Sequence, residues 1–261
     1  METTRSEIIS KVPQVTLLFW IIKILATTLG ETGGDAVTMS WLGETTSAGS
    51  GMGYLIGTAI FGILFVIAVV IQIRAAKFHP FLYWFTIVAT TTVGTTLADF
   101  CTRSLGIGYT GGSSILLILV IGSLVTWRLS TGSISIETVN TPKVEIFYWV
   151  TIMFSQTLGT ALGDWFADTA DLGYLGAAAA FGSGLAILIA LYYWTSVSRT
   201  ILFWIAFILT RPLGAVVGDF LDKPIAKGGL SLSRYTASIV LLVLIAALIY
   251  FIPQKAAEKT H

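Results

Sequence analysis

The sequence is poor in the residues that most catalytic and metal-binding sites use. It contains one cysteine, Cys101, and two histidines, His79 and His261. A single cysteine excludes an internal disulfide bond and a cysteine-rich metal site. The sequence also has no nucleophile–histidine pair, no HExxH zinc motif and no glycine-rich nucleotide loop, so we do not expect an enzyme.

Charged residues are also scarce. Asp, Glu, Lys and Arg make up 11% of the 261 residues, whereas hydrophobic residues make up 55% and the mean hydropathy is +0.84. A soluble domain usually contains about 25% charged residues. A chain this apolar cannot hide its surface in a water-facing core, so we predict an all-α integral membrane protein in a lipid bilayer. The net charge of +1 gives no reason to expect a nucleic-acid partner.

A short motif occurs four times along the chain. In each copy a Trp precedes a Gly by ten residues and an Asp follows that Gly by five: Trp20-Gly30-Asp35, Trp84-Gly94-Asp99, Trp149-Gly159-Asp164 and Trp204-Gly214-Asp219. Fixed spacing in four copies indicates internal repeats. We expect each Trp to anchor its helix at the membrane surface. We expect each Gly, aided by Pro212 in the last copy, to loosen the helix and free backbone carbonyls as ligands.

Eight segments have the length and composition of transmembrane helices, which need about 20 mostly apolar residues. They cover residues 15–34, 54–73, 81–98, 109–127, 146–163, 172–194, 201–218 and 235–252. We expect them to pair as helical hairpins, one for each repeat, within a single membrane domain. The repeats are predicted to span residues 12–80, 81–142, 143–198 and 199–253. Because each repeat contributes two spans, the four repeats are parallel and both termini lie on one side.

The distribution of Lys and Arg predicts which side that is, because cytoplasmic loops carry an excess of these residues. Loops inside the hairpins contain four of them: Arg103, Lys223, Lys227 and Arg234. The terminal segments and the links between hairpins contain nine: Arg5, Lys11, Arg74, Lys77, Arg128, Lys143, Arg199, Lys255 and Lys259. The excess places both termini in the cytoplasm.

Polar residues recur every fourth position before and after each motif Asp, and residues four apart share one face of a helix. The four stripes are Lys23, Thr27, Glu31 and Asp35; Thr91, Thr95, Asp99 and Arg103; Gln156, Thr160, Asp164 and Asp168; and Arg211, Ala215, Asp219 and Lys223. A charged side chain at the bilayer centre costs about 2.5–3.5 kcal/mol on the insertion scale. We therefore expect these carboxylates to face a partner, a cation or a wet cavity.

The stripes predict two kinds of repeat. In the second and fourth repeats a base follows the motif Asp by one turn, so a structural ion pair is a competing explanation there. In the first repeat Glu31 and Asp35 share a face whose only base is Lys23, two turns away. In the third repeat Asp164 and Asp168 share a face with no base. Paired carboxylates without local neutralisation call for a cation or for shifted protonation.

The residues of these stripes form the candidate site. The predicted cation ligands are the carboxylates of Glu31, Asp35, Asp99, Asp164, Asp168 and Asp219, with supporting groups on Thr27, Thr91, Thr95, Gln156 and Thr160. Ligands that are all oxygen favour Mg²⁺, Ca²⁺ or Mn²⁺ over Zn²⁺ or Cu⁺. Na⁺ or a proton alone also suits these carboxylates. Lys23, Arg103 and Arg211 are predicted to compensate charge or to couple ion movement, and simple ion pairing explains them equally well.

The repeats resemble a bacterial family of four-repeat membrane proteins known only as a repeat of unknown function. The resemblance is carried by four tandem two-helix units, each with a Trp and a core similar to T-x-G-x-x-x-x-D, and it covers residues 12–252. It implies a bacterial inner-membrane protein with eight helices, and it implies no activity. The fourth repeat departs from the pattern at Arg211, Pro212 and Ala215. The acidic stretch from Glu31 to Asp35 is also similar to Gly-Asp motifs in manganese and calcium exchangers.

These observations predict a secondary-active transporter, acting as an exporter, for a hard cation such as Mn²⁺ in exchange for protons, with no tightly bound cofactor. We expect export because the chain has no ATP-binding motif. An acidic ring in a cation channel is one alternative, and a transporter of a small organic cation, with an aromatic wall of Trp165, Phe166 and Tyr174, is another. A scaffold or sensor that transports nothing is a third. A homodimer is left open.

Overall fold

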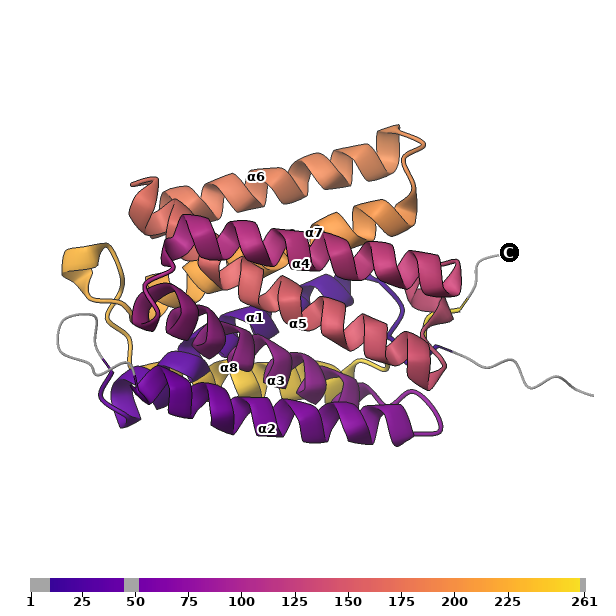
Figure 1. The fold of residues 1–261 in the computed structure, drawn as a ribbon, viewed down its shortest axis with the longest axis horizontal. Coiled ribbons are helices and arrows are strands. Elements are labelled where there is room, and N and C mark those ends of the chain that lie inside the picture. Colours follow the sequence, from indigo (N-terminus) through magenta and orange to yellow (C-terminus); the bar gives the residue numbers. More distant parts are fainter. Residues whose placement is uncertain (1–9, 45–51, 259–261) are drawn as a thin grey trace, which may run out of the picture.

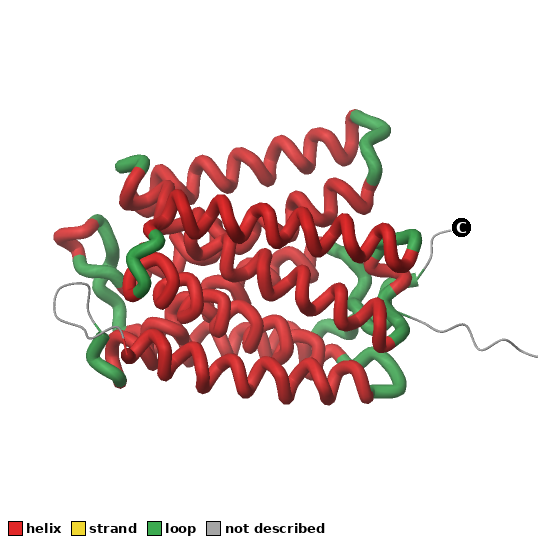
Figure 2. The backbone as a smooth tube through the Cα atoms, viewed as in Figure 1, coloured by secondary structure: helices red, strands yellow, loops and turns green. Residues whose placement is uncertain are grey.

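The structure is a computed structural model that describes residues 10–44 and 52–258 of the chain. Within these residues the fold is entirely helical, apart from one isolated bridge between Pro13 and Ala256. The long helices are α1 (Leu17–Asp35), α2 (Met52–Arg74), α3 (Pro80–Asp99), α4 (Gly108–Thr131), α5 (Pro142–Asp164), α6 (Gly173–Trp194), α7 (Arg199–Asp222) and α8 (Arg234–Phe251). They run alongside one another, and the loops that join them gather at the two ends of the bundle (Figure 2).

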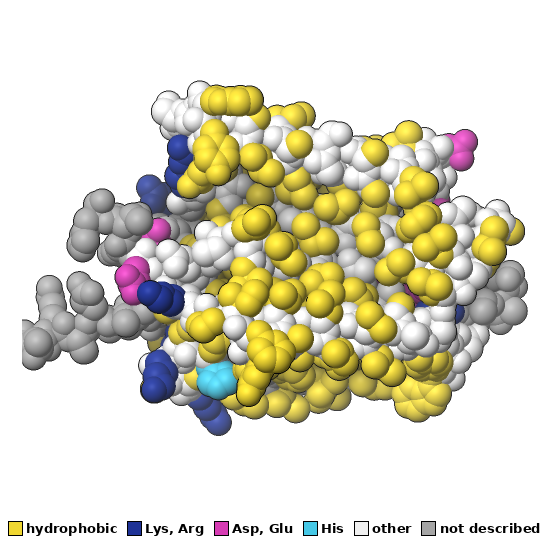
Figure 3. Space-filling view, turned by 180° about the vertical axis from the view of Figure 1, so that it is seen from behind, with side chains coloured by type: hydrophobic (Ala, Val, Ile, Leu, Met, Phe, Trp, Pro, Cys, Tyr) yellow, Lys and Arg dark blue, Asp and Glu magenta, His cyan; other side chains and the backbone are white. Residues whose placement is uncertain are grey.

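Seven of these helices are long and apolar enough to cross a membrane. The exception among the eight predicted spans is α5, whose polar residues are buried against its neighbours. Hydrophobic side chains cover the middle of the face in Figure 3, and charged side chains lie toward its ends. The chain is therefore a multi-pass membrane protein by length and composition.

The odd-numbered helices form a closed inner ring. Each packs against two others of the set: α1 against α3 and α7, and α5 against α3 and α7. The even-numbered helices lie outside this ring (Figure 1). Only 17–22% of the most apolar window is buried in each outer helix, compared with 61–72% in α1, α3 and α7. The ring consequently holds the polar stripes, and the outer helices present apolar surface to the outside of the bundle.

Each outer helix packs mainly on the inner helix of the next repeat. The pairs are α2 with α3, α4 with α5, α6 with α7, and α8 with α1. This differs from the helical hairpins that we expected, because the two helices of one repeat do not make each other's main contact. The last outer helix closes the ring onto the first inner helix, so all four repeats interlock.

The motif glycines allow the inner helices to approach closely. Each faces the residue three positions before the motif Gly of the next repeat: Gly30 faces Thr91, Gly94 faces Gln156, Gly159 faces Arg211 and Gly214 faces Thr27. A Cβ added at these glycines would lie between 2.0 and 2.9 Å from the nearest atom. The helices remain α-helical through all four glycines and through Pro212. The expected loosening at Gly is therefore wrong, and small residues serve close helix packing here.

The motif Trp residues pack in the interior. Trp84, Trp149 and Trp204 are 1–2% exposed and belong to one hydrophobic cluster, with Trp20 half-buried against it. The aromatic residue before each of them joins the same cluster: Phe19, Tyr83, Tyr148 and Phe203. The interfacial anchoring that we predicted is wrong for the three buried Trp residues, because they lie on inner helices. Their layer fills the bundle axis near the N-terminal ends of the inner helices.

Both ends of the described chain lie at this aromatic end of the bundle. The amide of Gln14 donates to the Lys255 carbonyl at 2.8 Å, and the amide of Ala257 donates to the Val12 carbonyl at 2.8 Å. Arg5 and Lys259, which contributed to the predicted orientation, lie outside the described residues.

Candidate functional site

The polar stripes line the axis of the inner ring, as their spacing predicts. Twelve of their side chains are at most 3% exposed: Lys23, Thr27, Glu31, Asp35, Thr91, Thr95, Asp99, Gln156, Thr160, Asp164, Arg211 and Asp219. Corresponding positions in the repeats lie at similar depths because the inner helices run side by side. The four motif Asp residues, which we call the acidic layer, lie at the end of the bundle away from the aromatic cluster.

The acidic layer coincides with a change in helix type. Asp35, Asp99 and Asp164 are each the last residue of an α-helix, and a π-helical turn follows each of them: η1 (Ala36–Trp41), η2 (Phe100–Ser104) and η4 (Trp165–Thr169). In the fourth repeat α7 continues as an α-helix three residues past Asp219. Single π-helical turns are uncommon and are frequent at functional sites. The irregular backbone thus begins at the carboxylates and not at the glycines.

One lysine joins the first and fourth repeats. Lys223 Nζ donates to Asp35 and lies 3.0 Å from Asp219 Oδ1. Arg234 Nε lies 2.8 Å from Asp222 and 3.9 Å from Asp35. Lys223 follows the last residue of α7; burial opposes its protonated form, but Asp219, Asp35 and Asp222 outweigh this and raise the pKa of Lys223 well above its usual range. Lys223 is therefore a charged bridge between two motif carboxylates.

One arginine joins the second and third repeats in the same way. Arg103 Nε lies 3.0 Å from Asp99 Oδ1, and its Nη2 donates to Asp164 Oδ2 at 3.2 Å. Asp168 is exposed and lies outside this arrangement. We predicted that Asp35 and Asp164 lack a basic neighbour, and this is wrong, because the base comes in each case from an adjacent repeat.

Arg211 connects all four inner helices. Its Nη2 lies 3.0 Å from Glu31 Oε2, 2.6 Å from Thr95 Oγ1 and 2.5 Å from Thr160 Oγ1. These partners come from α1, α3 and α5, while Arg211 itself is on α7. The arginine that departs from the repeat pattern is thus the residue that cross-links the ring one layer below the acidic layer.

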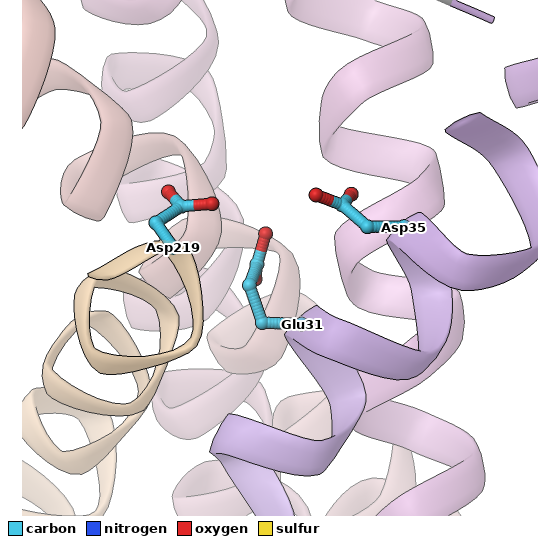
Figure 4. Close-up of side chains that lie close together, drawn as sticks. All are labelled: Glu31, Asp35 and Asp219. Atoms are coloured by element: carbon cyan, nitrogen blue, oxygen red, sulfur yellow. The ribbon is translucent and has the colours of Figure 1, made fainter. Parts of the chain in front are cut away.

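Three carboxylates come together between α1 and α7. One oxygen from each of Glu31, Asp35 and Asp219 lies within 4.8 Å of the other two, and all three residues are buried. Figure 4 shows the three side chains pointing toward one another. This arrangement, which we call the carboxylate triad, offers oxygen ligands suited to a hard cation. Asp99 and Asp164, which we also predicted as ligands, lie on the Arg103 side of the acidic layer.

The formal charges of the acidic layer do not cancel. Its four carboxylates, Asp35, Asp99, Asp164 and Asp219, carry −4, and Arg103 and Lys223 supply +2, which leaves −2. Asp222 pairs with Arg234, and Glu31 pairs with Arg211. The excess therefore belongs to the layer that contains the motif Asp residues.

A comparison with protein families matches the chain four times, at residues 18–78, 82–133, 147–198 and 202–255, to the family described as Repeat of Unknown Function (DUF347). The chain belongs to this family. The match confirms the resemblance drawn from the Trp, Gly and Asp spacing. Comparisons with curated proteins and with solved structures found no match. The family description names no activity, so function has to be argued from the site.

The site contains groups that the sequence analysis missed. Asp222 and Arg234 were not among the predicted site residues, although Asp222 follows Asp219 by three residues and so lies near the same helix face. Of the aromatic residues proposed as a wall, Tyr174 is buried within electrostatic reach of Asp219 and Lys223, and the other two make their contacts elsewhere. Phe166 packs against Phe181 with tilted rings, at 4.8 Å between centroids, and Trp165 lines a groove beside α4.

Proposed function

We propose that the protein is a secondary-active transporter of a hard divalent cation, with Mn²⁺ as the best candidate, and that it exchanges the cation for protons. The observation that carries this proposal is the carboxylate triad, because three buried carboxylate oxygens within 4.8 Å of one another form a compact oxygen site in a membrane-embedded ring. Once Lys223 leaves, Asp35 and Asp219 together carry a formal charge of −2, which matches a divalent cation. The absence of an ATP-binding motif from the sequence favours a gradient-driven exporter.

Lys223 is the group that a cation would have to displace from the triad. Its ammonium bridges Asp35 and Asp219, which are two of the three triad residues. Lys223 has extended backbone angles just past α7, so its side chain can swing away without unwinding that helix. Cation binding and the release of protons are linked whenever carboxylates must be ionised to act as ligands. In this mechanism cation, lysine and protons compete for the same oxygens.

Two obstructions along the axis of the inner ring favour a transporter over a channel. The aromatic cluster fills the axis at one end, and Arg211 crosses it in the middle with a buried guanidinium. A cation channel with an acidic ring needs a continuous path without a fixed positive charge. Alternating access between the two ends requires no such path. With cytoplasmic termini in a bacterial inner membrane, the aromatic end would face the cytoplasm and the triad would lie toward the outside.

Cation binding is tested by thermal unfolding of the purified chain with Mg²⁺, Ca²⁺, Mn²⁺, Zn²⁺ or Na⁺, because a ligand stabilises the native state that binds it. We expect Mn²⁺ to raise the unfolding midpoint of the wild type and not that of Asp219→Asn. Asp168→Asn is the matched control, since Asp168 is exposed and outside the triad. Failure of every cation to shift the wild type, or an equal shift in Asp219→Asn, would overturn the site.

Transport is tested in proteoliposomes that hold a pH gradient. We expect Mn²⁺ flux that saturates with Mn²⁺ concentration, moves protons in the opposite direction, and is lost in Asp219→Asn but kept in Asp168→Asn. Saturation and counterflow distinguish a transporter from a channel. Binding without any flux in this assay would leave a sensor as the better description.

A further inference from the structure

A second group of polar side chains lies on the axis between the carboxylate triad and the aromatic cluster. Six of their atoms have no hydrogen-bond partner within the described residues: Lys23 Nζ, Thr91 Oγ1, Gln156 Nε2, Gln156 Oε1, Arg211 Nε and Arg211 Nη1. All four side chains are 0% exposed. A buried polar group without a hydrogen-bond partner destabilises the folded state. Six such atoms in one part of the axis indicate a ligand that forms hydrogen bonds with several of them.

Packing holds these side chains at neighbouring positions on the axis. Thr91, Gln156 and Arg211 occupy the same position in their repeats, three residues before the motif Gly, on α3, α5 and α7. Lys23 reaches across from α1, with Nζ 4.2 Å from the centroid of the Phe207 ring. Phe207 precedes Arg211 by one turn of α7, so the ammonium and the guanidinium approach the same stretch of the axis.

The chemistry of the group is that of an anion site. Lys23, Arg211 and the Gln156 amide nitrogen only donate hydrogen bonds, the Thr91 hydroxyl can donate, and only Gln156 Oε1 must accept. Arg211 already pairs with Glu31, whereas Lys23 forms no ion pair with any described residue. Contact with an aromatic ring stabilises a cation and leaves its N–H groups unpaired. A lysine without an ion-pair partner among the described residues therefore faces an excess of hydrogen-bond donors.

We propose that Lys23, Thr91, Gln156 and Arg211 bind one small monovalent inorganic anion, of the class of chloride, bromide and nitrate. Water would satisfy some of the donors, but only an anion would also supply a negative partner for the protonated form of Lys23. The site lies nearer the aromatic cluster than the motif Asp residues do, and the Arg211–Glu31 ion pair connects it to the triad. It goes beyond the proposed cation transport and does not rest on it.

Thermal unfolding of the purified full chain in detergent tests this site. Sodium chloride is compared with sodium gluconate at equal sodium concentration and without divalent cations, because gluconate is too large for a buried site. We expect the unfolding midpoint to rise by a few degrees and to saturate with chloride, bromide or nitrate. Lys23→Met should abolish the response, and Lys227→Met, at an exposed lysine, should keep it.

Gln156→Glu gives a second test, in which the expected change is a gain in stability. It places a carboxylate of equal size among the same donors, so we expect a higher midpoint than the wild type in gluconate and no further response to chloride. No response in the wild type, or an unchanged chloride response in Gln156→Glu, overturns the anion site. Asp219→Asn should lose the Mn²⁺ shift and keep the chloride shift, so failure of this site and failure of the triad are distinguishable.

Discussion

The contact between α1 and α3 at Gly30 gives a quantitative test of the inner ring. A Cβ added at Gly30 would lie 2.4 Å from Thr91 Cγ2, 2.6 Å from Thr91 Oγ1 and 2.9 Å from Thr91 Cβ. Non-bonded carbon atoms normally lie about 3.5–4.0 Å apart. Thr91 is fully buried and its β-branched side chain has few rotamers, so Gly30→Ala must push the two helices apart.

The expected loss of stability follows from two opposing effects. Overpacking a well-packed interior typically costs about 1–3 kcal/mol, and occasionally more. Alanine is favoured over glycine within a helix by about 1 kcal/mol. Gly30→Ala should therefore destabilise the fold by up to about 2 kcal/mol. The matched control is Gly122→Ala in α4, where an added Cβ meets nothing within 4 Å, and we expect it to stabilise slightly.

Equilibrium unfolding of both variants in the same mixed micelles measures this difference. A double variant adds a stricter condition, because Thr91→Gly removes all three of the atoms that clash with the added methyl group. Combining Gly30→Ala with Thr91→Gly should recover about 0.5–3 kcal/mol relative to the sum of the single changes. The close packing is refuted if Gly30→Ala is as stable as Gly122→Ala, or if the two changes are simply additive.

Two buried ion pairs give further predictions. Lys223→Met leaves Asp35 and Asp219 without their shared base, so we expect a loss of about 3–5 kcal/mol in unfolding free energy. Adding Asp35→Asn should restore part of it, and a double variant as unstable as Lys223→Met would argue against the bridge. At the other end of the bundle Lys11 Nζ lies 2.7 Å from fully buried Glu145. Lys11→Met should lower the unfolding midpoint and Glu145→Gln should partly rescue it; equal midpoints for the single and double variants would contradict the pairing.

The buried faces of the inner helices could be predicted from the sequence because they depend on local geometry alone. Residues four apart share a helix face whatever surrounds the helix. Gln156, Thr160 and Asp164 are accordingly at most 3% exposed, as the third stripe predicts. The same rule fails one step later at Asp168, which is exposed. A π-helical turn begins at Trp165, and its wider turn shifts the register on which the prediction depended.

The partners of the charged residues could not be predicted in the same way. Spacing by four identified Arg103 beside Asp99 and Lys223 beside Asp219. It gave no sign that Arg103 also reaches Asp164, 61 residues away, or that Lys223 reaches Asp35, 188 residues away. Those contacts depend on the order of the helices around the ring. Tertiary structure likewise determines that each outer helix packs on the next repeat and that the last outer helix closes onto the first inner helix. Local periodicity does not encode these contacts.

The repeats are equivalent in their carboxylates and unequal in their bases, and this inequality gives the axis its charge pattern. If every repeat paired its Asp with its own base, the acidic layer would be neutral and would have no net attraction for a cation. Two bases, each shared by two carboxylates, hold the layer together and leave −2. Lys23, which occurs in one repeat only, places an amino group without a partner among the described residues nearer the aromatic cluster. A divalent cation in the triad and a monovalent anion beside Lys23 would neutralise the two regions separately. Asp219 belongs only to the cation site and Lys23 only to the anion site, so the Asp219→Asn and Lys23→Met variants should each lose one response and keep the other.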